Sequence, residues 1–166
     1  MTFIKKIKKD GSNVILYKCP DPVSEILISD GETCQIAFLD VETTGLLHNE
    51  DEVIELAVRV LLIEKRTGKI IRVISEFESF NEPRKSIDSS ITRLTGINSK
   101  MVNGKKISWS RVKKNLKDVD LIISHNASFD RPFVDANSEI SKSKLWGCSI
   151  KDIDWLTRGF INVKQE

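Results

Sequence analysis

The stretch FLDVETTGL, residues 38–46, places two carboxylates in an otherwise apolar run. Because side chains alternate along a strand, Asp40 and Glu42 share one face with Phe38, about 6.5 to 7 Å apart. Burying their charge beside Phe38 is costly unless a cation balances it, and a divalent metal ion does this well. A strand end that emerges into solvent would carry the same pair at no cost. On this stretch alone, both interpretations stay open.

Apolar runs rich in β-branched and aromatic residues around this stretch predict a sheet. QIAFLDV (35–41), EVIELAVRVLLIE (52–64) and IIRVISEFESF (70–80) are three candidate strands. The polar segment 65–69 suits a hairpin turn, so the last two of these strands are expected to pair antiparallel. LIIS (121–124) is a fourth candidate strand, and LWGCSI (145–150) is a possible fifth.

After Pro83 the apolar residues follow helical spacing. Ile91 and Leu94, followed by Gly96, predict a short helix over about 88–95. A second amphipathic helix is predicted by the helical spacing of Val112, Leu116 and Val119. Its outer face carries four cations: Arg111, Lys113, Lys114 and Lys117. We interpret that face as a solvated surface in preference to a nucleic-acid patch.

A third helix is predicted by an apolar stripe at positions 129, 133, 136 and 140. Pro132 falls inside this stripe, and proline is comfortable only in the first turn of a helix. We therefore expect the helix to begin near Ser128 or later, or to be kinked.

The composition indicates one globular domain. The 166 residues are 40% hydrophobic and 30% charged, which is enough for a sizeable core and too little for two full domains. No apolar run approaches the roughly 18 residues of a membrane span, and no apolar segment follows the N-terminal lysines as in a secretory signal. We therefore expect a cytoplasmic protein with no membrane partner. The net charge of +2 produces no global field that would indicate nucleic acid.

Residues 1–34 are interpreted as an N-terminal extension and residues 35–166 as the body of the domain. Cys19, Cys34 and Cys148 are odd in number and widely spaced, which argues against a disulfide framework and against a zinc site. We expect them to be small core residues.

A third carboxylate, Asp130, follows the fourth candidate strand at the start of a helix. Acids at the ends of different strands can converge, and two metal ions about 3.5 to 4 Å apart held by such acids activate water for phosphodiester cleavage. Hydrated sites of oxygen ligands suit Mg²⁺ or Mn²⁺. The alternative for Asp130 is a charge that stabilises the helix N-terminus.

These residues carry a resemblance to a known family. FLDVETTGL (38–46) resembles the first motif of the DEDD superfamily of 3′-to-5′ exonucleases, which includes the proofreading subunit of bacterial DNA polymerase III. SHNASFDRPFV (124–134) resembles its second motif, and PRKSIDSSITRLTGI (83–97) is similar to the segment that ends in a Thr-Gly-Ile turn. The resemblance covers residues from about 35 to 160. It implies a ribonuclease-H-like α/β fold, a mixed sheet flanked by helices.

The resemblance also implies roles for individual residues. Asp40 would contact both metal ions, Glu42 one and Asp130 the other. The residues that would hold the terminal nucleotide or shape its pocket are Thr43, Thr44, Gly45, Leu46, Thr95, Gly96, His125, Asn126 and Phe129. Structural alternatives exist for most of them: a turn for Thr44 and Gly45, a core contact for Leu46 and Phe129, a helix cap for Asn126, and a helix end for Thr95 and Gly96.

The family's third motif supplies a fourth aspartate and a general base, as H-x-A-x-x-D or Y-x-x-x-D. The string at 125–130 fits H-x-A-x-x-D by letter but matches the second motif better. His48 lacks the required continuation, Tyr17 precedes the first motif, and Asp135, Asp152 and Asp154 follow no matching pattern. We therefore expect a chain truncated at its C-terminus, incomplete in fold there and weak or inactive as a fragment.

The leading hypothesis is a 3′-to-5′ exonuclease that uses two Mg²⁺ or Mn²⁺ ions. Its partner would be the 3′ end of a single-stranded nucleic acid, with DNA favoured over RNA, and a DNA polymerase is a possible partner. The alternative is a non-catalytic nucleic-acid-binding or adaptor module of the same fold.

Overall fold

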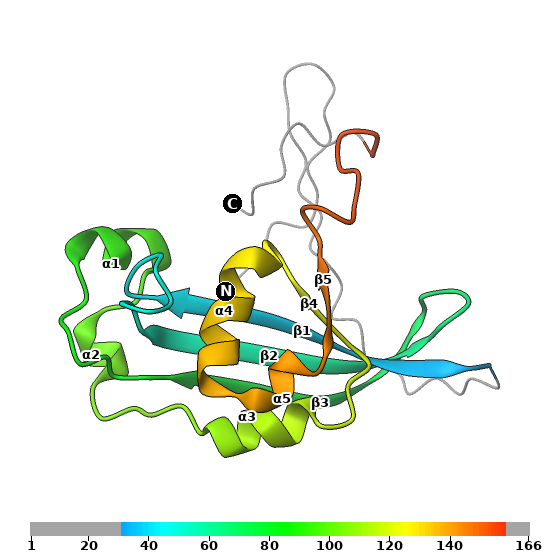
Figure 1. Cartoon of the computed structure of the whole chain (residues 1–166), viewed down its shortest axis with the longest axis horizontal. Coiled ribbons are helices and arrows are strands. Elements are labelled where there is room, and N and C mark those ends of the chain that lie inside the picture. The colour runs from blue at the N-terminus through cyan, green and yellow to red at the C-terminus, as the bar shows by residue number, and fades with distance from the viewer. Residues whose placement is uncertain (1–30, 159–166) are drawn as a thin grey trace.

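The computed structural model describes residues 31–158, and their fold is organised around three long strands (Figure 1). These strands are β1 (Thr33–Thr43), β2 (Val53–Glu64) and β3 (Ile70–Phe80). β1 pairs antiparallel with β2, and β2 pairs antiparallel with β3 through the predicted hairpin turn. The three strands predicted from alternating and apolar runs are confirmed, although β1 begins at Thr33, before the predicted boundary.

Two short parallel strands complete the sheet on the other side of β1. β4 (Leu121–Ser124) pairs parallel with β1, and β5 (Leu145–Cys148) pairs parallel with β4. The order is β3-β2-β1-β4-β5, so β1 is the central strand. This is the mixed sheet that the resemblance implies. β5 ends at Cys148, two residues before the predicted end.

Helices cover one face of this sheet. α4 (Ala127–Asn137) and α5 (Glu139–Lys142) lie in front of the strands in Figure 1, and α3 (Trp109–Leu116) lies next to them at the lower edge. α1 (Ser89–Thr95) and α2 (Ser99–Val102) lie at the end of the sheet toward which β1 runs. α3 contacts β2 and β3, whereas α4 contacts β1, β4 and β5.

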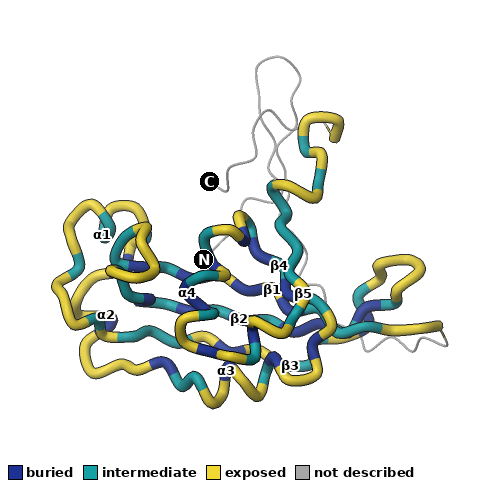
Figure 2. Tube along the Cα trace, in the orientation of Figure 1, coloured by how far each residue is buried: buried dark blue, intermediate teal, exposed yellow. Residues whose placement is uncertain are grey.

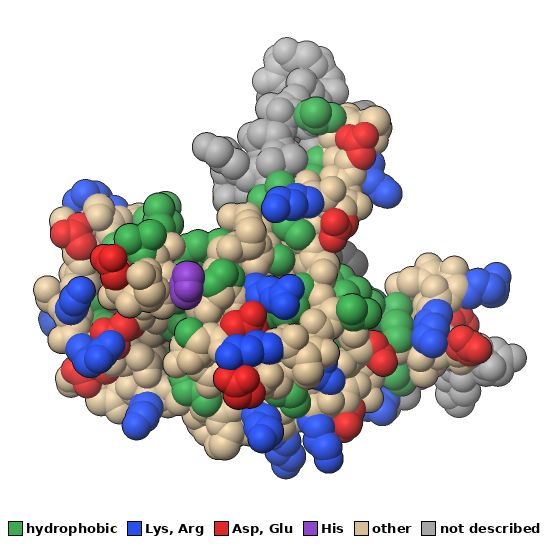
Figure 3. Space-filling view, viewed as in Figure 1, with side chains coloured by type: hydrophobic (Ala, Val, Ile, Leu, Met, Phe, Trp, Pro, Cys, Tyr) green, Lys and Arg blue, Asp and Glu red, His purple; other side chains and the backbone are tan. Residues whose placement is uncertain are grey.

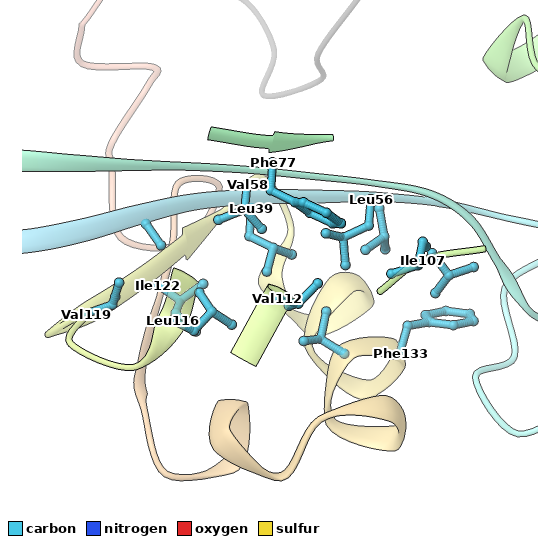
Figure 4. Close-up of a cluster of buried hydrophobic side chains, with 14 of the residues drawn as sticks. Leu39, Leu56, Val58, Phe77, Ile107, Val112, Leu116, Val119, Ile122 and Phe133 are labelled. Atoms are coloured by element: carbon cyan, nitrogen blue, oxygen red, sulfur yellow. The ribbon is translucent and has the colours of Figure 1, made fainter. Parts of the chain in front are cut away.

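The core lies between the sheet and these helices (Figure 4). Alternate residues of β1 and β2 point into it, and they meet the buried side chains Val112 and Leu116 of α3 and Phe133 of α4. Figure 2 shows this burial along the central strands and the adjacent helix, with exposed residues at the β2–β3 turn. A smaller cluster of Ile54, Ile97 and Val102 holds the α1–α2 segment on the end of β2.

The predicted third helix differs from the structure. The apolar stripe is divided between two helices, because α4 ends at Asn137 and Ile140 lies in α5. α4 begins at Ala127, so Pro132 lies in its interior and not in its first turn. The second helix, α3, ends at Leu116, before Val119.

The prediction that the cysteines are core residues is wrong where the structure tests it. Cys34 and Cys148 are free thiols and only half-buried, and Cys19 lies outside the described residues. Of the predicted N-terminal extension, residues 1–30 also lie outside them. No helix within residues 31–158 has both the length and the apolar character needed to cross a bilayer.

Candidate active site

β1 places Asp40 and Glu42 on the face opposite the core. Ala37, Leu39 and Val41 are at most 3% exposed and point toward the helices, so the residues between them point the other way. Phe38 on that face is 43% exposed. The predicted shared face of the two carboxylates is confirmed.

Asp130 reaches β1 from the first turn of α4. Its carboxyl is 1% exposed, and its Oδ1 accepts a hydrogen bond of 3.1 Å from the backbone N–H of Val41. Its Oδ2 is buried and has no hydrogen-bond partner among the described residues. This contact joins two segments 89 residues apart and places Asp130 beside the strand that carries Asp40 and Glu42.

The strand β4 aligns the second motif with the first. Ser124 is buried, and its Oγ donates a hydrogen bond of 2.7 Å to the backbone oxygen of Leu39. Asn126 then adopts a left-handed conformation with φ of 73°, which asparagine tolerates better than most residues. The chain turns sharply there, and α4 begins at once, so Asp130 is directed back toward β1.

The three carboxylates interact electrostatically. Burial is the main cause, and repulsion by Asp40 the next, that raises the pKa of Asp130 from 3.8 to about 7. The hydrogen bond from the Val41 N–H acts in the opposite direction and lowers this pKa. Desolvation raises the pKa of Asp40, and His125 opposes that rise. Desolvation and Asp40 also raise the pKa of Glu42. Each acid therefore makes ionisation of the others more costly.

A divalent cation fits the chemistry of these donors. A buried carboxylate oxygen without a partner is costly, and mutual repulsion among three acids adds to that cost. A cation bound among hard oxygen ligands would relieve both. Among residues 31–158, however, no three His, Cys, Asp or Glu side chains stand close enough to hold one ion together. Joint coordination therefore requires the carboxylates to move toward one another.

The loop after β1 is held by Asp51. The Asp51 carboxylate accepts hydrogen bonds from the Thr44 hydroxyl (3.2 Å) and from the backbone N–H of Leu47 (2.9 Å). A Cβ at Gly45 would overlap the Asp51 carboxylate, so a larger residue there would displace Asp51 from these hydrogen bonds. The turn interpretation of Thr44 and Gly45 is confirmed.

Leu46 projects from this loop into solvent. Its side chain is 80% exposed, so the core-contact alternative for Leu46 is wrong. Thr43, by contrast, is buried, and its hydroxyl donates to the backbone oxygen of Gly45. The loop therefore presents the apolar Leu46 side chain on a backbone held by hydrogen bonds, at the end of the strand that carries Asp40 and Glu42.

The remaining second-motif residues surround the start of α4. His125 Nδ1 lies 2.8 Å from Ser149 Oγ. Phe129 is half-buried against the core, with its ring centre 5.3 Å from that of Phe133, as the core-contact alternative predicted. Asn126 occupies the N-cap position of α4, as the helix-cap alternative predicted, but its side chain makes no capping hydrogen bond.

Thr95 and Gly96 form the end of α1. Gly96 has φ of 78°, and its N–H donates to the Thr92 oxygen. The Thr95 hydroxyl donates to the Ile91 oxygen (3.0 Å) and accepts from the Ile97 N–H (3.1 Å). These bonds satisfy the helix end, as the structural alternative predicted.

The sequence analysis did not identify two acids that lie near the site, Glu55 and Asp51. Glu55 on β2 is the cross-strand partner of Glu42, and its charge contributes to the raised pKa of Glu42. Alternation along β2 combined with the antiparallel hairpin could have placed it there. Asp51 carried no such signal, because its contact with Gly45 depends on the path of the loop.

The other aspartates tested for a third motif have structural partners. Asp135 bonds Arg131 and Ser141, Asp152 accepts from the Cys148 N–H, and Asp154 accepts from the Thr157 N–H. The His48 ring lies edge-on to Phe133, with ring centres 6.3 Å apart.

Comparison with known proteins agrees with this geometry. The profile of the RNase T family, described as an exonuclease, matches residues 37–146, which include all three carboxylates. The chain is 32% identical over 121 residues to "DNA polymerase III PolC-type" of Caldanaerobacter subterraneus subsp. tengcongensis, covering 71% of this chain. It is 33% identical over 132 residues to the protein of the same description from Latilactobacillus sakei subsp. sakei, covering 78% of this chain. In each case the chain spans 8% of the relative's length.

Two solved structures share the fold. One is exonuclease X in complex with 5′ overhanging duplex DNA, at a TM-score of 0.52 and 21% identity, covering 75% of this chain and 66% of that one. The other is E. coli exonuclease I in complex with a 5cy-dA13 oligonucleotide, at a TM-score of 0.54 and 14% identity, covering 70% of this chain and 28% of that one. The mixed five-stranded sheet with its helices is the ribonuclease-H-like fold of these exonucleases.

Proposed function

Because the chain belongs to the RNase T family of DEDD 3′-to-5′ exonucleases, we propose that it hydrolyses phosphodiester bonds from the 3′ end of single-stranded DNA with Mg²⁺ or Mn²⁺. The observation that carries the proposal is the position of Asp130: buried on Val41 of β1, with one carboxylate oxygen unpartnered and its ionisation coupled to Asp40. A helix-terminal charge would not need burial against the central strand. DNA is favoured because the solved structures of this fold named above contain DNA.

Asp40, Glu42 and Asp130 are the residues that would hold two cations, with Asp40 shared between them. Such ions, when bound, supply an activated water and neutralise charge on the leaving oxygen. The protein itself must then position the scissile phosphate beside β1. Outside the second motif, residues 1–166 contain no pattern that matches the family's third motif, so we expect these residues alone to hydrolyse DNA weakly, since general base catalysis contributes ~10² to 10⁴ in rate.

The loop after β1 would position the terminal nucleotide. Leu46 is an exposed apolar side chain suited to lie against a base, and its backbone is held by Gly45 and Asp51. His125, Asn126 and Phe129 would form the opposite wall at the start of α4. Thr95 and Gly96 would approach the same nucleotide from the end of α1.

The test is release of mononucleotides from a 3′-labelled single-stranded DNA by the full-length protein in Mg²⁺. We expect Asp40→Asn and Asp130→Asn each to abolish release, whereas Asp118→Asn, an exposed acid after α3, should leave it unchanged. A matched RNA oligonucleotide should be a poorer substrate. Release that survives Asp40→Asn would contradict the proposal, and binding without any release would favour the adaptor module.

A further inference from the structure

Residues 89–117 form an unusually basic segment in a nearly neutral chain. Between Asp88 and Asp118 there is no acidic residue, whereas eight positions are basic: Arg93, Lys100, Lys105, Lys106, Arg111, Lys113, Lys114 and Lys117. All eight side chains are exposed. None forms an ion pair with an acid elsewhere in residues 31–158. Their charge is therefore not balanced within the described structure.

Half of these cations lie on α3 or directly after it. Figure 3 shows Lys and Arg side chains gathered along the edge of the molecule where α3 lies in Figure 1. Val112 and Leu116 of this helix are fully buried, so Arg111, Lys113 and Lys114 occupy its outer surface, and Lys117 directly follows its end. We call these four residues the α3 basic surface.

The stability of α3 explains only part of this distribution. Lys113 and Lys117 are like charges four positions apart, an arrangement that weakens a helix. The first turn contains Arg111 and no acid, although acids there would stabilise the helix dipole. Arg111 is also held in place, because its guanidinium lies 5.1 Å from the centre of the Phe77 ring. Lys113 and Lys114 do lie in the last turn, where cations stabilise the helix dipole, so helix stability leaves the first-turn Arg111 unexplained.

The nearby acids do not neutralise the surface: the exposed Asp118, next to Lys117, offsets at most one of its four charges. Asp120 accepts a hydrogen bond of 2.8 Å from the backbone N–H of Gln35. Glu139 pairs with Lys142. Lys144 adds a further cation at the end of α3, where its Nζ donates to the backbone oxygens of Lys117 and Val119. The surface therefore presents positive charge to solvent.

Of the three candidate metal ligands, Asp130 lies on the same side of the sheet as this surface, because α3 and α4 both cover the core face. Asp130 lies in the first turn of α4, and the other end of α4 leads into α5, which contacts α3. α4 has 11 residues and so spans about 16 Å. Since stacked nucleotides advance about 3.4 Å each along one strand, about five nucleotides cover that distance.

We infer that the α3 basic surface binds the phosphate backbone of the DNA strand on the 5′ side of the nucleotide held in the active site. This inference rests on the proposed function, because the ligand is the same DNA strand. A row of exposed lysines without acids suits a polyanion bound through its phosphates, independent of base sequence. The surface would increase affinity for long strands and leave the shortest ones unaffected.

The test compares two triple variants of the full-length protein. Lys113→Gln/Lys114→Gln/Lys117→Gln removes three charges from the α3 basic surface. Lys65→Gln/Arg66→Gln/Lys69→Gln removes three charges from the β2–β3 turn, at the end of the sheet away from α1 and α2 (Figure 1). All six side chains are exposed, so both variants should fold as the wild type does. Binding of 5′-fluorescein-labelled dT20 and dT4 is followed by fluorescence anisotropy in EDTA, from 50 to 300 mM NaCl.

We expect the α3 variant to bind dT20 about tenfold to a hundredfold more weakly at 0.1 M salt and to lose about 2 from the slope of log affinity against log salt concentration. The turn variant should match the wild type, and dT4 should bind all three proteins alike. An unchanged dT20 slope in the α3 variant, or an equal loss in the turn variant, would overturn the inference. Because EDTA prevents hydrolysis, this outcome is separate from the nuclease test of Asp40→Asn.

Discussion

Replacing Asp130 by asparagine should stabilise the metal-free protein at high pH while it abolishes activity. The pKa of Asp130 is raised from 3.8 to about 7 by burial and by Asp40. Below pH 3.8 this carboxyl is protonated in both folded and unfolded chains. Between 3.8 and 7 the folded chain keeps a proton that the unfolded chain has lost, so stability falls as pH rises. Above pH 7 the full cost remains, about 4 kcal/mol at 1.36 kcal/mol per pKa unit.

Asparagine has no such ionisation. Its amide would occupy the place of the unpartnered Oδ2 and lose about 1 to 3 kcal/mol, but that loss is the same at every pH. Between pH 5 and pH 8 the pH-dependent part therefore changes by about 3 kcal/mol, in favour of the variant at pH 8. The constant terms cancel in this difference.

The assay is urea unfolding in EDTA at pH 5, 6, 7 and 8, followed by tryptophan fluorescence. Asp118→Asn serves as the control, because that acid is exposed and should show no such dependence. Added Mg²⁺ at pH 8 should then stabilise the wild type and leave Asp130→Asn unchanged, since binding to the folded state alone adds about 2.7 kcal/mol at a hundred times Kd. If the stability difference between wild type and Asp130→Asn is equal at pH 5 and pH 8, the electrostatic account of this site is wrong.

Three further substitutions separate the parts of the structure. Gly45→Ala should lower the free energy of unfolding by about 1 to 3 kcal/mol, because the added Cβ would overlap Asp51 Oδ2. An unchanged Tm would mean that the loop is not packed as described. Leu46→Ala should change the free energy of unfolding by less than about 0.5 kcal/mol, since the side chain is 80% exposed, but it should reduce the rate of DNA hydrolysis. Unchanged steady-state kinetics would exclude a contact between Leu46 and the nucleotide. Val112→Ala should create a cavity in the core and lower the free energy of unfolding in urea by about 1 to 3 kcal/mol, with the metal affinity unaltered. A matching loss of metal affinity would show that the core and the site are coupled.

The strands and the pairing of the two β1 carboxylates were predictable because they depend on local alternation. Leu39 and Val41 are buried and Asp40 and Glu42 point the other way, as a two-residue period requires. The convergence of Asp130 came from a family resemblance, because the bond from Val41 spans 89 residues and no local pattern encodes it.

The errors arose where a tertiary or backbone requirement overrides local preference. Asn126 takes the N-cap position of α4, but its left-handed backbone between β4 and α4 leaves its side chain without a capping hydrogen bond. The helical stripe to Ile140 was interrupted at Ser138, whose extended backbone ends α4 and precedes α5. Leu46 is apolar and yet exposed, since it lies in a loop outside the core.

The central claim is that Asp40, Glu42 and Asp130 close together around a divalent cation. Anomalous diffraction from crystals of the protein soaked in Mn²⁺ tests this claim most directly. We predict manganese density within coordination distance of all three carboxylates, and its loss from crystals of Asp130→Asn. Manganese density absent from this site, or bound without Asp130, would contradict the account.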